Sequence, residues 1–145
     1  MVTLLLKKSY LHQDLKEISF NDLWNGHGIF TTMRVVGKSA KILFNENAKI
    51  VKQKNIFHGY QSKVRVTNDS KLFKKNKIFK VGRYHSLKLY EPFKSNNIKI
   101  TMRCAKSNIP MAIENKENNV YGFQFHPESF LTENGNFIIK KILSS

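Results

Sequence analysis

The stretch Tyr121-Gly122-Phe123-Gln124-Phe125-His126-Pro127-Glu128-Ser129 decides how the fold of this 145-residue chain is interpreted. Its aromatic residues alternate with small or polar ones, which is the period of a half-buried strand. We expect the strand to end at Pro127, because proline cannot donate to a strand ladder. His126 and Glu128 would then lie where a strand gives way to a loop, with a carboxylate close enough to orient an imidazole. They are candidate catalytic groups, and the alternative is a structural histidine beside a solvated glutamate.

Other strand patterns lie upstream of that stretch. Apolar residues at 98, 100, 102 and 104 alternate with polar residues at 99, 101 and 103, so residues 98–104 are predicted to form a half-buried strand. Residues 111–113 and 120–123 flank a polar run, which predicts a hairpin. Shorter strands are expected at 50–51 and 63–66.

A helix is expected at the C-terminus. Thr132 is positioned to cap it, and Phe137, Ile138 and Ile142 would form its apolar face. Together with the strand patterns, this helix predicts an α/β fold whose C-terminal half is rich in strands and ends in a helix.

Three separated motifs resemble the class I glutamine amidotransferases. They are Gln124-Phe125-His126-Pro127-Glu128-Ser129, His58-Gly59 and Arg83-Tyr84-His85-Ser86-Leu87. Within that family the chain is most similar to the small subunits of anthranilate synthase and aminodeoxychorismate synthase. The resemblance implies a partial α/β amidotransferase fold. Residues 45–145 would form an amidotransferase-like domain truncated at its N-terminal side, and residues 1–44 an atypical N-terminal segment.

The resemblance also implies a reaction. An amidotransferase of this class uses a thiolate to attack the side-chain amide of glutamine, an imidazole to move the proton and a carboxylate to orient the imidazole. The matching residues are His126 for the imidazole and Glu128 for the carboxylate, while the backbone of Ser86 and Leu87 would help to hold glutamine. Ammonia would pass to a chorismate-binding synthase large subunit, in folate or tryptophan biosynthesis. No metal ion and no organic cofactor are expected.

The nucleophile has no matching residue in this chain. In the family it lies in a Gly-x-Cys-x-Gly-His-Gln segment, and the matching window, residues 35–44, contains no cysteine. The single cysteine, Cys104, would lie on the apolar side of its strand, where burial raises the pKa of a thiol and suppresses its reactivity. We therefore expect Cys104 to be structural and the chain to have little or no glutaminase activity by itself.

A shorter stretch near the N-terminus resembles a different enzyme. Residues 19–38, and especially Gly28-Ile29-Phe30-Thr31-Thr32-Met33-Arg34-Val35, are similar to the N-terminal segment of fold-type IV pyridoxal-phosphate enzymes, in particular aminodeoxychorismate lyase. No lysine of this chain can be assigned the Schiff-base role, so the cofactor is not expected to bind. On this resemblance, residues 1–44 would be a lyase-like remnant.

Composition and charge favour a globular protein. The chain has 41% hydrophobic residues, a formal net charge of +15 and no apolar run long enough for a membrane span. Its lysines are spread from Lys7 to Lys141. The charge therefore predicts solubility rather than a specific nucleic-acid partner. With one cysteine and no signal-peptide core, we expect a cytoplasmic protein.

Three interpretations are open on the sequence alone. The first is a truncated amidotransferase-like domain without glutaminase activity of its own. The second is a non-catalytic module that binds a synthase large subunit, and the third is a decayed gene product whose half sheet leaves edges and apolar faces uncovered. His58 and His85 lie in family motifs, and each is as readily structural as functional.

Overall fold

The computed structural model describes residues 4–7, 47–67, 69–115 and 120–144. Within that part of the chain, a helix with the length and apolar character for crossing a bilayer does not occur. The described elements are, in chain order, β1 (Leu4–Lys7), β2 (Ile50–Lys52), β3 (Tyr60–Val66), β4 (Ile78–Arg83), β5 (Leu87–Leu89), β6 (Ile98–Cys104), β7 (Pro110–Asn115), β8 (Val120–Phe123) and α4 (Gly135–Leu143).

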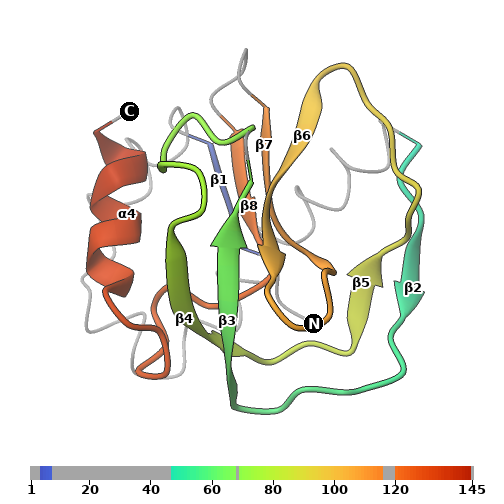
Figure 1. Cartoon of the computed structure of the whole chain (residues 1–145), viewed down its shortest axis with the longest axis horizontal. Helices are drawn as coiled ribbons and strands as arrows, with labels where there is room; N and C mark the ends of the chain where they lie inside the picture. Colours follow the sequence, from blue (N-terminus) through green and yellow to red (C-terminus); the bar gives the residue numbers. More distant parts are fainter. Residues whose placement is uncertain (1–3, 8–46, 68, 116–119, 145) are drawn as a thin grey trace.

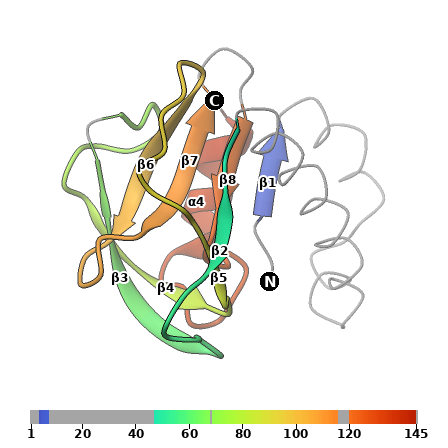
Figure 2. The same ribbon diagram turned by 90° about the vertical axis from the view of Figure 1, so that its right-hand side faces the viewer.

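Six of these strands form one antiparallel sheet in the order β1-β8-β7-β6-β3-β4, and β2 pairs with β5 as a separate two-stranded ribbon. Figure 1 shows α4 on one side of the large sheet and the ribbon on the other, and the turned view in Figure 2 agrees. Because β7 lies inside this layered arrangement, all six of its residues are buried.

The predicted hairpin and the two predicted short strands are confirmed. β7 pairs with β8 from Ala112 opposite Phe123 to Asn115 opposite Val120. β2 contains residues 50–51, and β3 contains residues 63–66, where buried valines alternate with an exposed lysine and arginine. This alternation is the expected signature of a strand with one face on the core.

The strand predicted over residues 98–104 forms as β6, but its alternation is interrupted. Ile98 and Ile100 pack with Ile113 in a small apolar cluster, whereas Met102 and Cys104 pack in the main core. The pairing of β6 with β7 shifts register on either side of Met102. Because a shift of one residue reverses the face that a side chain takes, the prediction that these apolar residues share one face is wrong.

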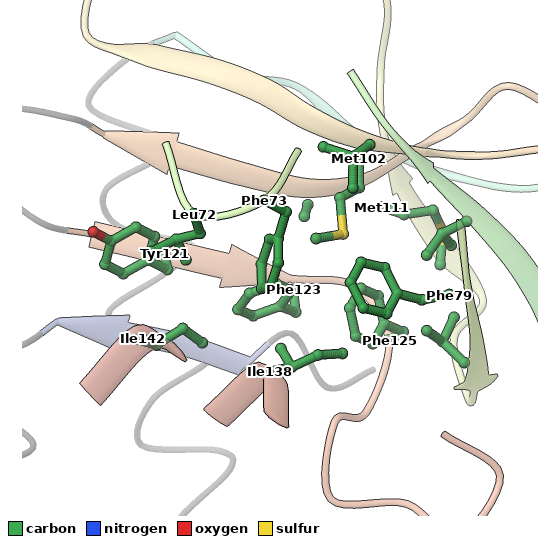
Figure 3. Close-up of a cluster of buried hydrophobic side chains, with 14 of the residues drawn as sticks. Leu72, Phe73, Phe79, Met102, Met111, Tyr121, Phe123, Phe125, Ile138 and Ile142 are labelled. Carbon is green, nitrogen blue, oxygen red and sulfur yellow. The ribbon is translucent and has the colours of Figure 1, made fainter. Parts of the chain in front are cut away.

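The main core lies between the large sheet and α4 (Figure 3). Ile138 and Ile142 of the helix are fully buried in a cluster that includes Phe123 and Phe125. Burying an apolar side chain of this size contributes about 1.5–3 kcal/mol. Phe137, predicted on the same helix face, is 44% exposed. Its ring still packs against the buried Phe73, with centroids 6.3 Å apart, so Phe137 lies at the edge of the apolar face.

The predicted cap of the helix is wrong. The N-cap residue of α4 is Asn134, with a left-handed φ of 57°, and no side chain of the described residues makes a capping bond. The Thr132 hydroxyl instead accepts from the Gly82 amide and donates to the His126 carbonyl. Thr132 is therefore used to join β4 to the loop after β8.

Part of the atypical segment 1–44 belongs to the large sheet. β1 pairs with β8, from Leu4 opposite Phe123 to Lys7 opposite Val120. The other residues of the segment, including the lyase-like stretch 19–38 and the window 35–44, lie outside the described residues. The domain boundary at residues 44 and 45 stays a prediction.

Candidate active site

The candidate site forms where β4 meets the loop after β8. His126 makes an isolated antiparallel bridge with Gly82, and its amide donates to the Gly82 carbonyl at 3.1 Å. The Thr132 hydroxyl lies 2.9 Å from the Gly82 amide and 2.5 Å from the His126 carbonyl oxygen. A side chain at Gly82 would not fit, because its Cβ would lie 2.8 Å from Ser129 Oγ. The regular strand β8 ends at Phe123, but the pairing resumes at His126.

His126 and Glu128 lie in direct contact. His126 Nδ1 is 2.8 Å from Glu128 Oε1, and the two side chains are 14% and 31% exposed. A carboxylate only accepts hydrogen bonds, so the hydrogen of the neutral ring lies on Nδ1 and the lone pair on Nε2. Nε2 is buried and has no hydrogen-bond partner among the described residues. This arrangement can accept a proton at Nε2, as a general base must.

Tyr84 fixes the imidazole from the side of β4. Its ring packs edge-on against the His126 ring, with centroids 5.1 Å apart and planes at 77°. The Tyr84 hydroxyl lies 3.1 Å from Ser129 Oγ, within hydrogen-bonding distance. The motif Arg83–Leu87 and the motif 124–129, far apart in sequence, therefore lie side by side.

Ser86 and Leu87 follow this tyrosine and are half-buried. The Ser86 carbonyl accepts from the Gln53 backbone amide at 2.9 Å, and Leu87 begins β5 opposite Lys52. The segment predicted to hold glutamine is thus part of the β2–β5 ribbon and is linked to His126 through Tyr84. Its role in binding, like the catalytic roles of His126 and Glu128, stays a prediction.

Arg83 and His85 form a buried polar pair that sequence reasoning did not anticipate. Each is 1% exposed, and Arg83 Nε donates to His85 Nε2 at 2.9 Å. Burial lowers the pKa of His85 to about 4; the Leu87 carbonyl acts in the opposite direction, and Arg83 and His126 lower it further. His85 is therefore a neutral, buried residue. The motif contained both residues, but no local pattern distinguishes a buried arginine from an exposed one.

Cys104 requires a correction. It is buried, as predicted, but it is the last residue of β6 and its Sγ lies 3.6 Å from Arg83 Nη1. Burial raises the pKa of the thiol, yet hydrogen bonds from Ser107 and Lys106 and the charge of Arg83 outweigh it, so the net shift is downward. The expected rise in pKa is wrong because those neighbours favour the thiolate.

No group of three or more histidine, cysteine, aspartate or glutamate residues suited to a metal ion occurs in the described part of the chain. His58, the other motif histidine, is exposed in the bend before β3. Among the predicted site residues, His126 contacts Glu128, and the ring of Tyr84 packs against His126, whereas Ser86 and Leu87 follow Tyr84 in sequence and contact the β2 side of the ribbon.

A family model described as glutamine amidotransferase class-I matches residues 28–144, and the chain belongs to this family. The strand-rich sheet with its C-terminal helix is accordingly a partial class I glutamine amidotransferase fold. The match includes residues 28–38 of the stretch that resembles aminodeoxychorismate lyase, so that second resemblance gains no support from it.

Several curated relatives carry names from anthranilate synthase. Anthranilate synthase component 2 of Helicobacter pylori is 36% identical over 101 residues, covering 65% of this chain and 46% of that protein. The component 2 of Saccharolobus solfataricus is 37% identical over 100 residues, covering 67% and 50%. The bifunctional protein TrpGD of Thermotoga maritima is 42% identical over 98 residues, covering 66% and 16%. The chain thus spans about half the length of these component 2 proteins.

Solved structures support the same fold. A Thermoplasma acidophilum protein provisionally described as one of the subunits of GMP synthase superposes with a TM-score of 0.60 at 22% identity, over 71% of this chain and 50% of that one. PurLQS of Thermotoga maritima superposes with a TM-score of 0.54 at 18% identity, over 76% and 66%. At these identities the likeness concerns the fold alone.

Proposed function

We propose that this chain is the glutamine-binding part of an anthranilate synthase component 2, acts in the cytoplasm and docks on a chorismate-binding large subunit. Glutamine would lie between the Ser86–Leu87 backbone and the imidazole of His126, which Glu128 orients. Relatives named anthranilate synthase component 2 favour the tryptophan branch over the folate branch.

One observation carries the proposal. The 2.8 Å contact between His126 Nδ1 and Glu128 Oε1 leaves Nε2 as the basic nitrogen, without a hydrogen-bond partner among the described residues. A buried polar atom without a partner costs free energy, and such atoms are retained where a ligand uses them. The ring of Tyr84 packs against this imidazole, and the segment predicted to hold glutamine follows Tyr84 in sequence.

The same proposal includes weak or absent glutaminase activity for the chain alone. The window 35–44 has no cysteine, and Cys104 is 4% exposed and lies against Arg83. A buried thiol has no access to a substrate, whatever its pKa. Without a nucleophile, only the rate supplied by binding and electrostatics is left.

Titration calorimetry with L-glutamine, paired with an assay for released ammonia, tests both parts. We expect binding without ammonia release, and His126→Ala should weaken binding about tenfold, the effect of losing one hydrogen bond to a ligand. His58→Ala removes an exposed imidazole outside the site and is the matched control. Absence of glutamine binding would refute the proposal, and ammonia release that His126→Ala abolishes would refute the predicted inactivity.

A non-catalytic docking module is the second candidate. Phe130 is 79% exposed and Tyr60 is 62% exposed, and both flank the contact in which the Gln61 side chain donates to the Leu131 carbonyl. Exposed aromatic side chains of this kind are typical of protein interfaces. Co-elution with a chorismate-binding synthase large subunit, without any glutamine binding, would favour this candidate over the first.

A further inference from the structure

The buried contact between Arg83 and His85 decides which imidazole nitrogen carries the hydrogen. Arg83 Nε lies 2.9 Å from His85 Nε2, and a guanidinium group has only donors. His85 Nε2 must therefore be the accepting nitrogen. The hydrogen is left on Nδ1, which lies 3.0 Å from the Leu87 carbonyl oxygen and can donate to it.

Contacts from other elements hold Arg83 in this orientation. The guanidinium carbon lies 3.6 Å from the centroid of the Phe57 ring, a stacking contact that favours a cation. Nη1 lies 3.4 Å from Ser62 Oγ of β3 and 3.6 Å from Cys104 Sγ of β6. The side chain is 1% exposed, so its donors cannot turn to water instead of His85.

The other end of the network is the backbone of residues 85–87. The Gln53 side-chain amide donates to the His85 carbonyl at 2.6 Å, and its backbone amide donates to the Ser86 carbonyl at 2.9 Å. Gln53 Nε2 also lies 3.0 Å from His85 Nδ1, but its shorter contact is the hydrogen bond to the His85 carbonyl. His85 Nδ1 is therefore not required to accept a hydrogen bond from Gln53. His85 Nδ1 engages the Leu87 carbonyl. The carbonyls of residues 85, 86 and 87 thus each have a hydrogen-bond partner among the side chains and backbone of Gln53 and His85. These bonds fix the peptide planes of the segment.

We propose that Arg83 is a positioning residue that holds His85 as the neutral Nδ1–H tautomer, so that His85 holds the Ser86–Leu87 segment in the orientation that binds glutamine. The glutamine part rests on the proposed function, whereas the tautomer part rests on the contacts alone. A protonated His85 would place a second buried cation 2.9 Å from Arg83 Nε and leave that donor without an acceptor, so the network excludes the charged ring.

The wild-type protein provides the first test. Long-range proton–nitrogen NMR spectra of the chain with labelled histidine distinguish the two tautomers and the cation, and loss of one signal set in His85→Gln assigns His85. We expect a single neutral Nδ1–H form at pH 7. An Nε2–H tautomer or an imidazolium at that pH would overturn the proposal.

The second test removes the donor. Arg83→Met keeps the unbranched stem as far as the position of Nε and removes the donors. It should shift His85 to a mixture of tautomers and weaken glutamine binding about tenfold, the effect of one buried hydrogen bond. Arg103→Met is the matched control, because Arg103 pairs with Glu91 and its contacts among the described residues do not include His85. Unchanged spectra and affinity in Arg83→Met would overturn the proposal.

The readouts separate this proposal from the proposed function. If the wild-type chain binds no glutamine, the proposed function fails, while the tautomer spectra still decide the role of Arg83. If Arg83→Met does not fold, His85→Gln replaces it, since glutamine places its amide near the position of Nε2 and offers no N–H near Nδ1 to the Leu87 carbonyl. Wild-type glutamine affinity in His85→Gln would then overturn the proposal.

Discussion

Acidification should destabilise this protein through His85 before most carboxylates titrate. The pKa of His85 is about 4 in the folded chain against an ordinary 6.5, and the groups that face it are the Arg83 cation and the His126 ring. Between pH 6.5 and 4 the imidazole of residue 85 binds a proton in the unfolded chain but not in the folded chain. The free energy of unfolding therefore keeps its full value above pH 6.5 and decreases as the pH falls to about 4. The decrease due to this one group amounts to about 3 kcal/mol.

Urea denaturation at a series of pH values measures this effect. We expect the free energy of unfolding of the wild-type chain to fall more steeply between pH 6.5 and 4 than that of His85→Gln, which cannot titrate there. His58→Gln removes an exposed imidazole and should follow the wild-type curve. Parallel curves for the wild type and His85→Gln would refute the reasoning, because they would show that His85 binds protons equally in both states.

Two further predictions concern the stability of the fold. Gly135→Ala should destabilise the fold by about 3 kcal/mol or more, since its Cβ would lie 1.8 Å from the Pro127 carbonyl oxygen, whereas Asn136→Ala on the exposed side of α4 should have little effect. Glu114→Ala should cost about 2–4 kcal/mol, because this buried carboxylate accepts from a serine hydroxyl and a backbone amide at 2.7 Å. Glu133→Ala, which breaks an exposed ion pair, should cost less than about 1 kcal/mol. Urea denaturation measures the free energy of unfolding of each variant and of its control. Equal losses of this free energy in a variant and its control would contradict the prediction.

Period and motif were sufficient for the strand and loop that lead to His126 and Glu128, although β8 ends at Phe123 and no strand was predicted for β4, which leads into Tyr84. The alternation before Pro127 predicted a strand that delivers His126 and Glu128 to a loop, and the two side chains lie 2.8 Å apart. This succeeds because the relevant contacts are local: only Pro127 lies between the residue that carries the imidazole and the residue that carries the carboxylate. The hairpin of β7 and β8 was predictable for the same reason.

Hydrogen bonds and distant contacts that no periodicity encodes set the features that could not be predicted. Hydrogen bonds from Ser107 and Lys106 lower the pKa of Cys104 against the effect of burial, and the charge of Arg83, which approaches from another strand, adds to them. The prediction that Thr132 caps the helix is wrong because its hydroxyl accepts a hydrogen bond from the Gly82 amide, which is distant in sequence. In each case a residue with an ordinary local role is redirected by a partner that no periodicity reveals, as tertiary context commonly overrides local preference.

On the proposed function, the described residues carry the groups that would orient a substrate and accept a proton, and the sequence window that matches the family's nucleophile has no cysteine. Orienting contacts act on a bound amide whether or not its bond is broken, so binding and hydrolysis should be separable properties of this chain. Substitutions at Arg83, His85 and His126 should then change glutamine affinity and leave a near-zero rate unchanged. In an intact amidotransferase the same substitutions would be expected to change the rate as well, because there the oriented imidazole also takes the proton from the attacking thiol.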